Sequence, residues 1–149
     1  MKKIITKSLS ILGFTIPIFG CGGLDMYGTP SATYEVKGKV CDTDGNPIKG
    51  IKIVLQDDAT DPNPYEIAES QSLENGDYTI RNTTFPRSKL YLSVEDVDGT
   101  ANGGEFEEQT IELDFSKVEA TGDKDAWYNG TKSLEKHIVM QEKSDEAQE

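Results

Sequence analysis

The chain has 149 residues and a formal net charge of −12, with 27 acidic residues against 15 lysines and arginines. A surface this acidic repels the phosphates of nucleic acids and of anionic lipid headgroups, so neither is expected as a partner. The length suits a single folded domain, and a chain of this size buries roughly two-thirds of its unfolded surface.

The first twenty residues have the pattern of a secretory signal peptide. Lys2, Lys3 and Lys7 precede an apolar run that extends from Leu9 to Phe19. That run is too short to cross a bilayer, for which a helix needs about 20 residues. We therefore expect residues 1–20 to be removed, and the loss of their three lysines shifts the net charge from −12 to about −15.

The residues around Cys21 resemble the lipobox of bacterial lipoproteins, in which a small residue precedes a cysteine that is diacylated and becomes the new amino terminus. Gly20 supplies the small residue, whereas Phe19 is bulkier than the usual occupant of its position. The resemblance implies lipidation of Cys21 and a tether over residues 21–33. It also implies a location in the bacterial cell envelope, at the outer membrane, on either its periplasmic or its surface face.

The membrane is then a partner of this chain through the lipid anchor at Cys21. Two or three acyl chains bind a bilayer stably, whereas one chain alone binds only marginally. The alternative is an ordinary cleaved signal peptide that happens to contain a cysteine.

Beyond residue 33, apolar and polar residues alternate with the period of two that is typical of β-strands with one buried face. The alternation is clearest over residues 34–41 and 51–55. Residues 42–47 between them supply the Asp, Gly, Asn and Pro of a turn, so we expect these two strands to form a hairpin. Further strands are expected over residues 66–73, 78–82, 89–95, 106–115 and 136–141, and a long polar excursion over residues 116–131.

About seven short strands separated by turn signals, without an amphipathic helix, predict an all-β fold. The favoured architecture is a single antiparallel seven-stranded Greek-key β-sandwich. We expect this domain to cover residues 34–141. The charged residues 142–149 are expected to form a disordered acidic tail.

Two stretches, residues 36–53 and 75–80, resemble the carboxypeptidase regulatory-like β-sandwich, which is related to prealbumin-like folds. This resemblance implies a fold alone, because such domains accompany many activities. A narrower resemblance, to the radical SAM-associated lipoproteins of Bacteroidetes, adds the lipobox and five short motifs. These motifs are Tyr27–Pro30, Phe85–Pro86, Asp96–Gly99, Asn102–Gly104 and Trp127–Tyr128.

The narrower resemblance implies a lipoprotein whose protein partner is encoded by a neighbouring gene. The chain would be a partner or a substrate of a radical SAM protein. It is not expected to be such an enzyme itself, because its two cysteines are too few to hold an iron–sulfur cluster.

Asp96, Asp98 and Asn102 form the first candidate site, a metal site. They offer hard oxygen ligands at short spacing, and Ca²⁺ takes six to eight such oxygens. The alternative is an ordinary loop in which Asp and Asn side chains bond the local backbone and glycines allow the bend. Asp42, Asp44 and Asn46 pose the same question in the earlier turn, where the turn itself calls for those residue types.

Trp127 and Tyr128 form the second candidate site, an aromatic platform on which a sugar ligand would stack. The alternative is that the tryptophan closes one end of the sandwich. His137 is the only histidine and no nucleophile-elbow motif accompanies it, so catalytic residues are not expected. Cys41, left without a partner if Cys21 is lipidated, is interpreted as a small buried hydrophobic residue.

The function favoured by these patterns is that of a lipid-anchored envelope β-sandwich, a non-catalytic binding or interaction module that needs no cofactor. Two alternatives stay open. One is a Ca²⁺-dependent carbohydrate-binding module that uses the Asp96–Asn102 loop together with Trp127 and Tyr128. The other is a hydrolase that depends on His137.

Overall fold

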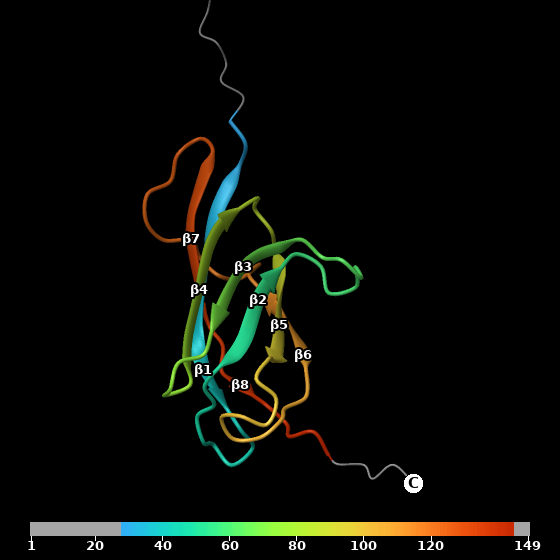
Figure 1. The fold of residues 1–149 in the computed structure, drawn as a ribbon. Coiled ribbons are helices and arrows are strands. Elements are labelled where there is room, and N and C mark those ends of the chain that lie inside the picture. The colour runs from blue at the N-terminus through green and yellow to red at the C-terminus, as the bar shows by residue number, and fades with distance from the viewer. Residues whose placement is uncertain (1–27, 145–149) are drawn as a thin grey trace, which may run out of the picture.

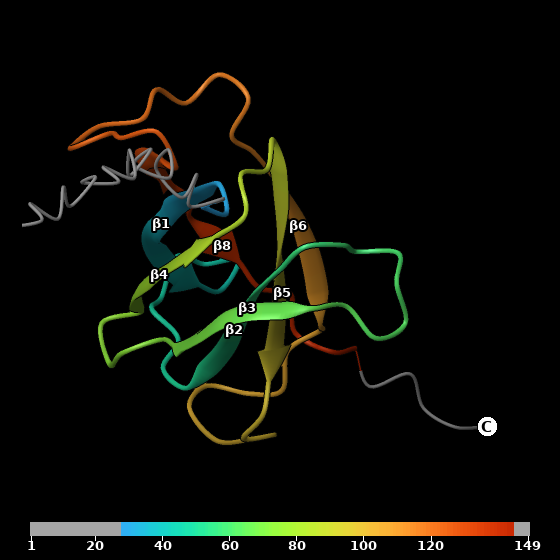
Figure 2. The ribbon, with the colours of Figure 1, turned by 90° about the horizontal axis from the view of Figure 1, so that it is seen from above.

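The computed structural model describes residues 28–144, and all regular structure in this range is β-strand (Figure 1). The strands are β1 (Ser31–Cys41), β2 (Ile51–Gln56), β3 (Glu66–Gln71), β4 (Asp77–Thr84), β5 (Lys89–Asp96), β6 (Gln109–Asp114), β7 (Tyr128–Glu135) and β8 (Ile138–Val139). They form two sheets, seen as two layers in Figure 2, so the predicted all-β sandwich is confirmed. The predicted signal peptide, Cys21 and most of the predicted tether and tail lie outside the described residues.

The first sheet is mixed and has β1 at its centre. β4 pairs with one edge of β1 and runs antiparallel to it, whereas β7 and then β8 pair with the other edge and run parallel to it. The expectation of a purely antiparallel sandwich is therefore wrong for this sheet. The reason is the long connection between β6 and β7, which returns the chain to the end where β1 begins before β7 starts.

The second sheet has the strand order β3-β2-β5-β6, and all three of its pairings are antiparallel. The described residues therefore contain eight strands where about seven were expected, the additional one being β7. Residues 28–144 contain no helix with the length and apolar character needed to cross a bilayer.

The predicted hairpin between the first two strands is wrong, because β1 and β2 belong to different sheets. After the turn, the chain folds back on the end of β1 for a single bridge between Cys41 and Pro47, and then leaves for the second sheet. Ser72 holds this crossing: its hydroxyl donates to the carbonyl of Ile48 (2.8 Å) and accepts from the N–H of Ile51 (2.9 Å). A turn signal predicts a reversal of the chain, and it does not say which sheet the next strand joins.

The core lies between the sheets, on the faces that the alternation predicted. The fully buried side chains include the inward residues of β1, β2 and β5. They are Tyr34, Val36, Val40, Ile51, Ile53, Leu55, Leu90, Leu92 and Val94. Each such side chain contributes about 1.5–3 kcal/mol by leaving water, so this interface provides most of the stability.

One corner of the sandwich, between β3 and β4, is closed by side chains instead of a strand pairing. The hydroxyl of Ser70 donates to the carbonyl of Thr79 at 2.9 Å, and the side-chain amide of Asn82 donates to the carbonyl of Ile67. These bonds occupy groups that would otherwise be open on two edge strands.

The folded body is slightly longer than the predicted domain. β1 begins at Ser31, three residues before the predicted boundary. At the other terminus, the N–H of Glu107 donates to the carbonyl of Gln141 (2.8 Å), and the N–H of Lys143 donates to the carbonyl of Glu105 (2.9 Å). Residues 142 and 143 therefore belong to the body and not to a free tail.

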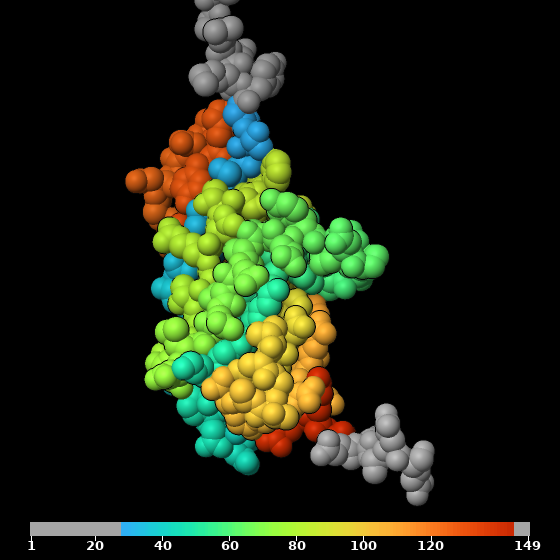
Figure 3. All heavy atoms as spheres, viewed as in Figure 1, coloured from blue at the N-terminus to red at the C-terminus, as the bar shows by residue number. Residues whose placement is uncertain are grey.

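The loops gather at two ends of the sandwich. The amino-terminal end, where β1 begins, carries the connections 57–65, 85–88 and 115–127. The opposite end carries the connections 42–50, 72–76 and 97–108. Figure 3 shows the last of these packed beside residues 42–50, and a Cβ built on Gly50 would lie 2.8 Å from the Asp98 carboxylate.

Candidate functional site

The Asp96–Asn102 loop, the predicted metal site, lies at the opposite end and is held by its own hydrogen bonds. The Asp96 carboxylate accepts the backbone N–H of Asp98 (3.2 Å) and that of Phe106 (3.0 Å). The side-chain amide of Asn102 donates to the Asp98 carboxylate. Gly99 and Asn102 have φ angles of 66° and 54°, so the chain bends tightly between them.

The structure thus brings the three predicted ligands together, but with their polar groups directed at one another and at the backbone. Asn102 offers an N–H to Asp98, whereas a calcium ligand would offer its oxygen. Residues 28–144 contain no cluster of three or more His, Cys, Asp or Glu side chains placed to hold a metal ion. This geometry is that of an Asx/Gly loop, and calcium binding there stays a prediction.

The earlier Asp42 turn has the same character. Its carboxylate accepts the N–H groups of Asp44 (2.9 Å) and Asn46 (2.8 Å), and also the side-chain amide of Asn46 (2.9 Å). These hydrogen bonds, above all the one from the Asn46 side chain, hold the pKa of Asp42 below its ordinary value. The Asp42 carboxylate is thus engaged in hydrogen bonds within the turn.

Trp127 and Tyr128, the predicted ligand-binding pair, have different surroundings. The indole of Trp127 lies against Gly28, where an added Cβ would come within 2.5 Å of the ring. The hydroxyl of Tyr128 instead donates to Thr33 at 2.8 Å. Asp125 fixes both residues, since its carboxylate accepts their two backbone N–H groups at 2.7 Å each. The two aromatic side chains therefore do not share one set of contacts, as a sugar platform would require.

Tyr128 belongs to a chain of hydroxyl groups on the outer face of the first sheet. Thr33 and Thr83 are cross-strand neighbours whose hydroxyls lie 2.7 Å apart, and Thr131 lies 3.1 Å from the Tyr128 hydroxyl. Hydrogen bonding with Thr131 and Thr33 lowers the pKa of Tyr128. This network satisfies the buried Thr33, which gives Tyr128 a structural role.

His137 lies in the irregular step between β7 and β8, and both of its ring nitrogens have partners. Nδ1 accepts the backbone N–H of Lys39 at 3.2 Å, and Nε2 lies 3.1 Å from a carboxylate oxygen of Glu135. A neutral imidazole bonded in this way carries its proton on Nε2. Neither partner is a serine, threonine or cysteine side chain, so the arrangement is that of a backbone-anchored side chain.

One hollow, of about 450 Å³, is an open groove on the outer face of the first sheet. Its central charge, the Glu35 carboxylate, already pairs with Lys37 (2.5 Å) and Arg81 (3.4 Å). A groove whose charges are paired within the protein offers little to a polar ligand.

A hollow of about 400 Å³, which we call the inter-sheet pocket, opens between the two sheets near the amino-terminal end. It is lined by Ala32, Tyr34, Pro86, Arg87, Ser88, Ser116, Asn129 and Lys132. None of these described lining residues is acidic, although the chain has 27 acidic residues. No motif in the sequence indicates this site.

The apolar floor of the inter-sheet pocket is the ring of Tyr34. This ring packs edge-on against Phe115, with centroids 4.9 Å apart and planes at 74°. The Tyr34 hydroxyl donates to the carbonyl of Arg87 (2.8 Å) and accepts the N–H of the same residue (2.6 Å). The floor and one wall of the pocket are therefore fixed to each other.

Lys132 supplies the cation of the inter-sheet pocket. It is the register partner of Tyr34 on the neighbouring strand, so both side chains lie on the inward face of the first sheet. Its ammonium donates to the carbonyl of Phe115 at 2.8 Å. Among residues 28–144, no carboxylate lies within ion-pairing distance of it, and an ammonium has three N–H donors, so two remain for a ligand.

Two carboxylates lie near the rim and limit the positive charge. Arg87 pairs with Asp57 at 3.0 Å, so its guanidinium is partly neutralised. Asp114 accepts the backbone N–H of Ser116 at 2.8 Å, and hydrogen bonding by Ser116 lowers the pKa of Asp114. Lys132 is therefore the group through which the pocket would attract an anion.

The sequence pattern does not predict Lys132 as a site residue, because it does not predict the strand β7 that carries it. The strand contains one aliphatic residue, Leu134, so its period of two carries almost no hydrophobic signal. The inward placement of Lys132 and Leu134 could have been found only by treating a lysine as an inward-facing residue.

Comparisons with known proteins give information on the fold alone. No protein-family model and no curated protein matches the chain. Among solved structures, chlorocatechol 1,2-dioxygenase from Pseudomonas putida is similar at 12% identity and a TM-score of 0.50, over 80% of this chain and 70% of that one. Hydroxyquinol 1,2-dioxygenase from Pseudomonas putida DLL-E4 is similar at 14% identity and a TM-score of 0.50, over 82% of this chain and 65% of that one. At this identity, the likeness extends to the β-sandwich and not to the activity.

Proposed function

We propose that this chain is a lipid-anchored, non-catalytic binding module of the bacterial cell envelope that holds a small anionic ligand in its inter-sheet pocket. The observation that carries the ligand class is the ammonium of Lys132, which faces inward over an aromatic floor without a carboxylate partner among the described residues. Lys132 is half-buried. A partly desolvated cation without a counterion is destabilising, and a bound carboxylate or phosphate relieves that cost.

We also propose that the domain is a seven-stranded Greek-key sandwich of the prealbumin-like type, with β8 as a continuation of β7. In support, β2, β3 and β4 follow one another around the corner of the sandwich, and β1 lies beside β4 after a long connection to β2. This strand order supports a Greek-key arrangement. The pairing of β1 with both β4 and β7 differs from the immunoglobulin order, in which the first strand lies beside the second.

The non-catalytic part of the proposal is supported by how the candidate groups are engaged. The nitrogens of His137 are bonded to the backbone of β1 and to a carboxylate. The geometry gives less support to a sugar-binding module, because the Trp127 and Tyr128 side chains have separate contacts.

The lipid anchor rests on the lipobox around Cys21 and on the position of the first described residues, which leave the sandwich at one end. A Cys21→Ser variant is expected in the soluble fraction of the cell envelope, and the native chain in the membrane fraction. Intact-mass measurement of the native chain tests the same point, since lipidation adds the mass of two or three acyl chains. A Cys21→Ser chain that stays with the membrane would contradict the anchor.

The ligand class is tested by titrating the mature chain with benzoate and with inorganic phosphate while recording its NMR spectrum. We expect one of these probes to shift signals of residues around Tyr34 and Lys132. The Lys132→Met variant should bind about tenfold or more weakly, because a charge-assisted hydrogen bond contributes about 1.5–3 kcal/mol.

Lys49→Met is the matched control, because Lys49 pairs with Glu74 on an exposed surface at the opposite end. It should leave the affinity unchanged. The absence of any shift around the pocket with either probe, or equal weakening by the two substitutions, would overturn the anionic ligand.

A further inference from the structure

Residues 28–144 expose six large apolar side chains, and the three aromatic ones lie at one end of the molecule. Tyr65 is 68% exposed, Phe85 is 58% exposed and Trp127 is 42% exposed. Each comes from a different connection of the amino-terminal end. The other three are the aliphatic Leu73, Val97 and Val139, which lie toward the opposite end.

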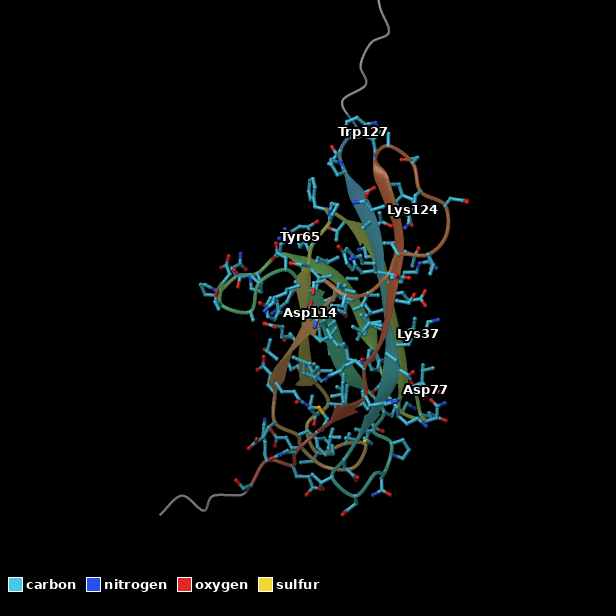
Figure 4. All side chains as sticks on the ribbon, turned by 180° about the vertical axis from the view of Figure 1, so that it is seen from behind. Lys37, Tyr65, Asp77, Asp114, Lys124 and Trp127 are labelled. Carbon is cyan, nitrogen blue, oxygen red and sulfur yellow. The ribbon has the colours of Figure 1, made fainter. Side chains whose placement is uncertain are left out.

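The three aromatic residues surround the point at which the described chain begins. On one side, the carbonyl of Trp127 accepts the N–H of Ser31 at 2.7 Å, and its indole lies against Gly28. On the other side, Tyr65 and Phe85 line a hollow of about 260 Å³ together with residues 29–31. We call Tyr65, Phe85 and Trp127 the aromatic collar; Figure 4 shows Trp127 beside the start of the described chain and Tyr65 toward the same end.

The aromatic collar is not explained by the packing of the sandwich. The core is formed by other residues, and the collar side chains stay exposed. Exposed apolar side chains gathered in one place mark a surface that contacts something else. Aromatic side chains, and above all tryptophan and tyrosine, are enriched where proteins meet the interface between lipid and water.

We propose that the aromatic collar docks on the lipid bilayer that carries the anchor, so that the amino-terminal end of the sandwich rests on the membrane. This inference rests on the proposed lipidation of Cys21. Seven residue steps separate Cys21 from Gly28, so Gly28, against which the Trp127 indole lies, can be no farther than about 25 Å from the lipidated residue. A tether this short keeps the collar within reach of the headgroups at all times.

Charge selects the kind of lipid surface. Asp57 and Asp125 lie beside the collar, and the whole chain is acidic. An anionic bilayer would repel this end, so the collar suits a zwitterionic surface, where aromatic rings insert without a net charge requirement.

The test uses Trp127, the only tryptophan in the sequence, as a native fluorescent reporter. The lipidated mature chain is reconstituted into phosphatidylcholine vesicles, with or without brominated acyl chains, and recovered by flotation. We expect Trp127 emission to shift to shorter wavelength relative to the soluble Cys21→Ser chain, and to be quenched by the bromines.

A double variant, Tyr65→Ser with Phe85→Ser, separates docking from mere proximity to the membrane. It should float with the vesicles as the native chain does but lose most of the quenching. The matched control, Leu73→Ser with Val139→Ser, changes two equally exposed apolar residues at the opposite end and should keep the quenching.

The outcomes distinguish the anchor from the collar. A chain that floats but shows the emission of the soluble chain overturns docking and leaves the anchor intact. Unchanged quenching in the Tyr65 and Phe85 double variant also overturns docking, because the tether alone would then explain the signal. A native chain that fails to float, with no lipid in its mass, overturns the anchor and with it the docking.

Discussion

At the scale of single residues, a few polar side chains fix the backbone where the sheets meet the loops. Tyr34 is the clearest case: it is almost completely buried, and its hydroxyl both accepts from and donates to the backbone of Arg87. One side chain from the centre of the first sheet thus holds the connection between β4 and β5. The same connection forms a wall of the inter-sheet pocket, so a stability measurement on Tyr34 reports on the pocket.

We predict that Tyr34→Phe lowers the free energy of unfolding by about 1–3 kcal/mol, because two backbone groups of Arg87 lose their partner while the ring stays. Urea denaturation followed by circular dichroism measures this change. Tyr91→Phe serves as the control, since its hydroxyl makes only a long 3.5 Å contact on an exposed surface. Equal effects of the two substitutions would contradict the role given to the Tyr34 hydroxyl.

Asp125 provides a prediction on pH dependence. The backbone N–H groups of Trp127 and Tyr128 lower the pKa of its carboxyl, so the folded state prefers the ionised form. Its contribution to stability is therefore present above the unfolded pKa and is lost as the pH falls through the folded pKa, below about pH 4.

We accordingly expect Asp125→Ala to destabilise the chain at pH 7 and to have a smaller effect at pH 3. Denaturant titrations of both chains at the two pH values measure the difference. A destabilisation of the same size at pH 3 and pH 7 would show that the ionised carboxylate is not what matters.

At the scale of elements, β1 decides the architecture because it pairs on both edges. Gly38 sits in its middle, where a Cβ would lie 1.8 Å from the carbonyl oxygen of Lys136 and 3.1 Å from the ring of Tyr78. The backbone between β7 and β8 thus passes directly over this position. A glycine is required there by close approach and not by backbone conformation.

We predict that Gly38→Ala destabilises the chain by about 1–3 kcal/mol or more, because the crowding atom is backbone and cannot move aside. The neighbouring Lys39→Ala should change stability by less than about 1 kcal/mol, since Lys39 makes only an exposed 3.7 Å ion pair with Asp77. Thermal melts of both variants test this contrast. A Gly38→Ala chain as stable as Lys39→Ala would mean that the β7–β8 step is free to shift.

The strands also show which features of the fold could be predicted from the sequence. Which residues face the core was predictable, because β1, β2 and β5 combine an apolar face with a polar face. The sheet that each strand joins was not, because the turns at Asp42–Pro47 and Asn75–Gly76 reverse the chain locally and yet connect strands of different sheets. β7 was not predictable for a different reason: its contacts are made by hydroxyls, a lysine and a single leucine.

The candidate sites likewise divide into what could and what could not be predicted from the sequence. The Asp96–Asn102 loop could be located from its residue types, but their hydrogen bonds to one another could not be predicted from their spacing. The inter-sheet pocket could not be located at all, since it joins residues from β1, β7 and two loops that are brought together only by the sheet order.

At the scale of the whole molecule, net charge opposes folding. An excess of carboxylates repels itself more strongly in the compact state than in the unfolded chain. The described residues contain eight ion pairs between a lysine or arginine and a carboxylate, all with an exposed partner, and each contributes only about 0–1 kcal/mol. Repulsion therefore outweighs the pairs.

We predict that raising the NaCl concentration from about 20 mM to about 500 mM increases the melting temperature, because salt screens the repulsion. CaCl₂ at matched ionic strength tests the predicted metal loop in the same experiment. A further increase with millimolar Ca²⁺ that disappears in Asp98→Asn would support calcium binding at Asp96, Asp98 and Asn102. An identical effect of the two salts would contradict it, and a melting temperature that falls with NaCl would contradict the charge argument.

The parallel pairing of β1 with β7 and β8 also sets an order of events during biosynthesis. The strand made first is completed by the strands made last, across nearly a hundred residues, so the first sheet cannot close until β7 and β8 have left the ribosome. Until then, β1 has an open edge that can pair with other chains. A chain of this design depends on being held apart from its copies while it is still incomplete, and truncation before Tyr128 should convert it into an aggregating species.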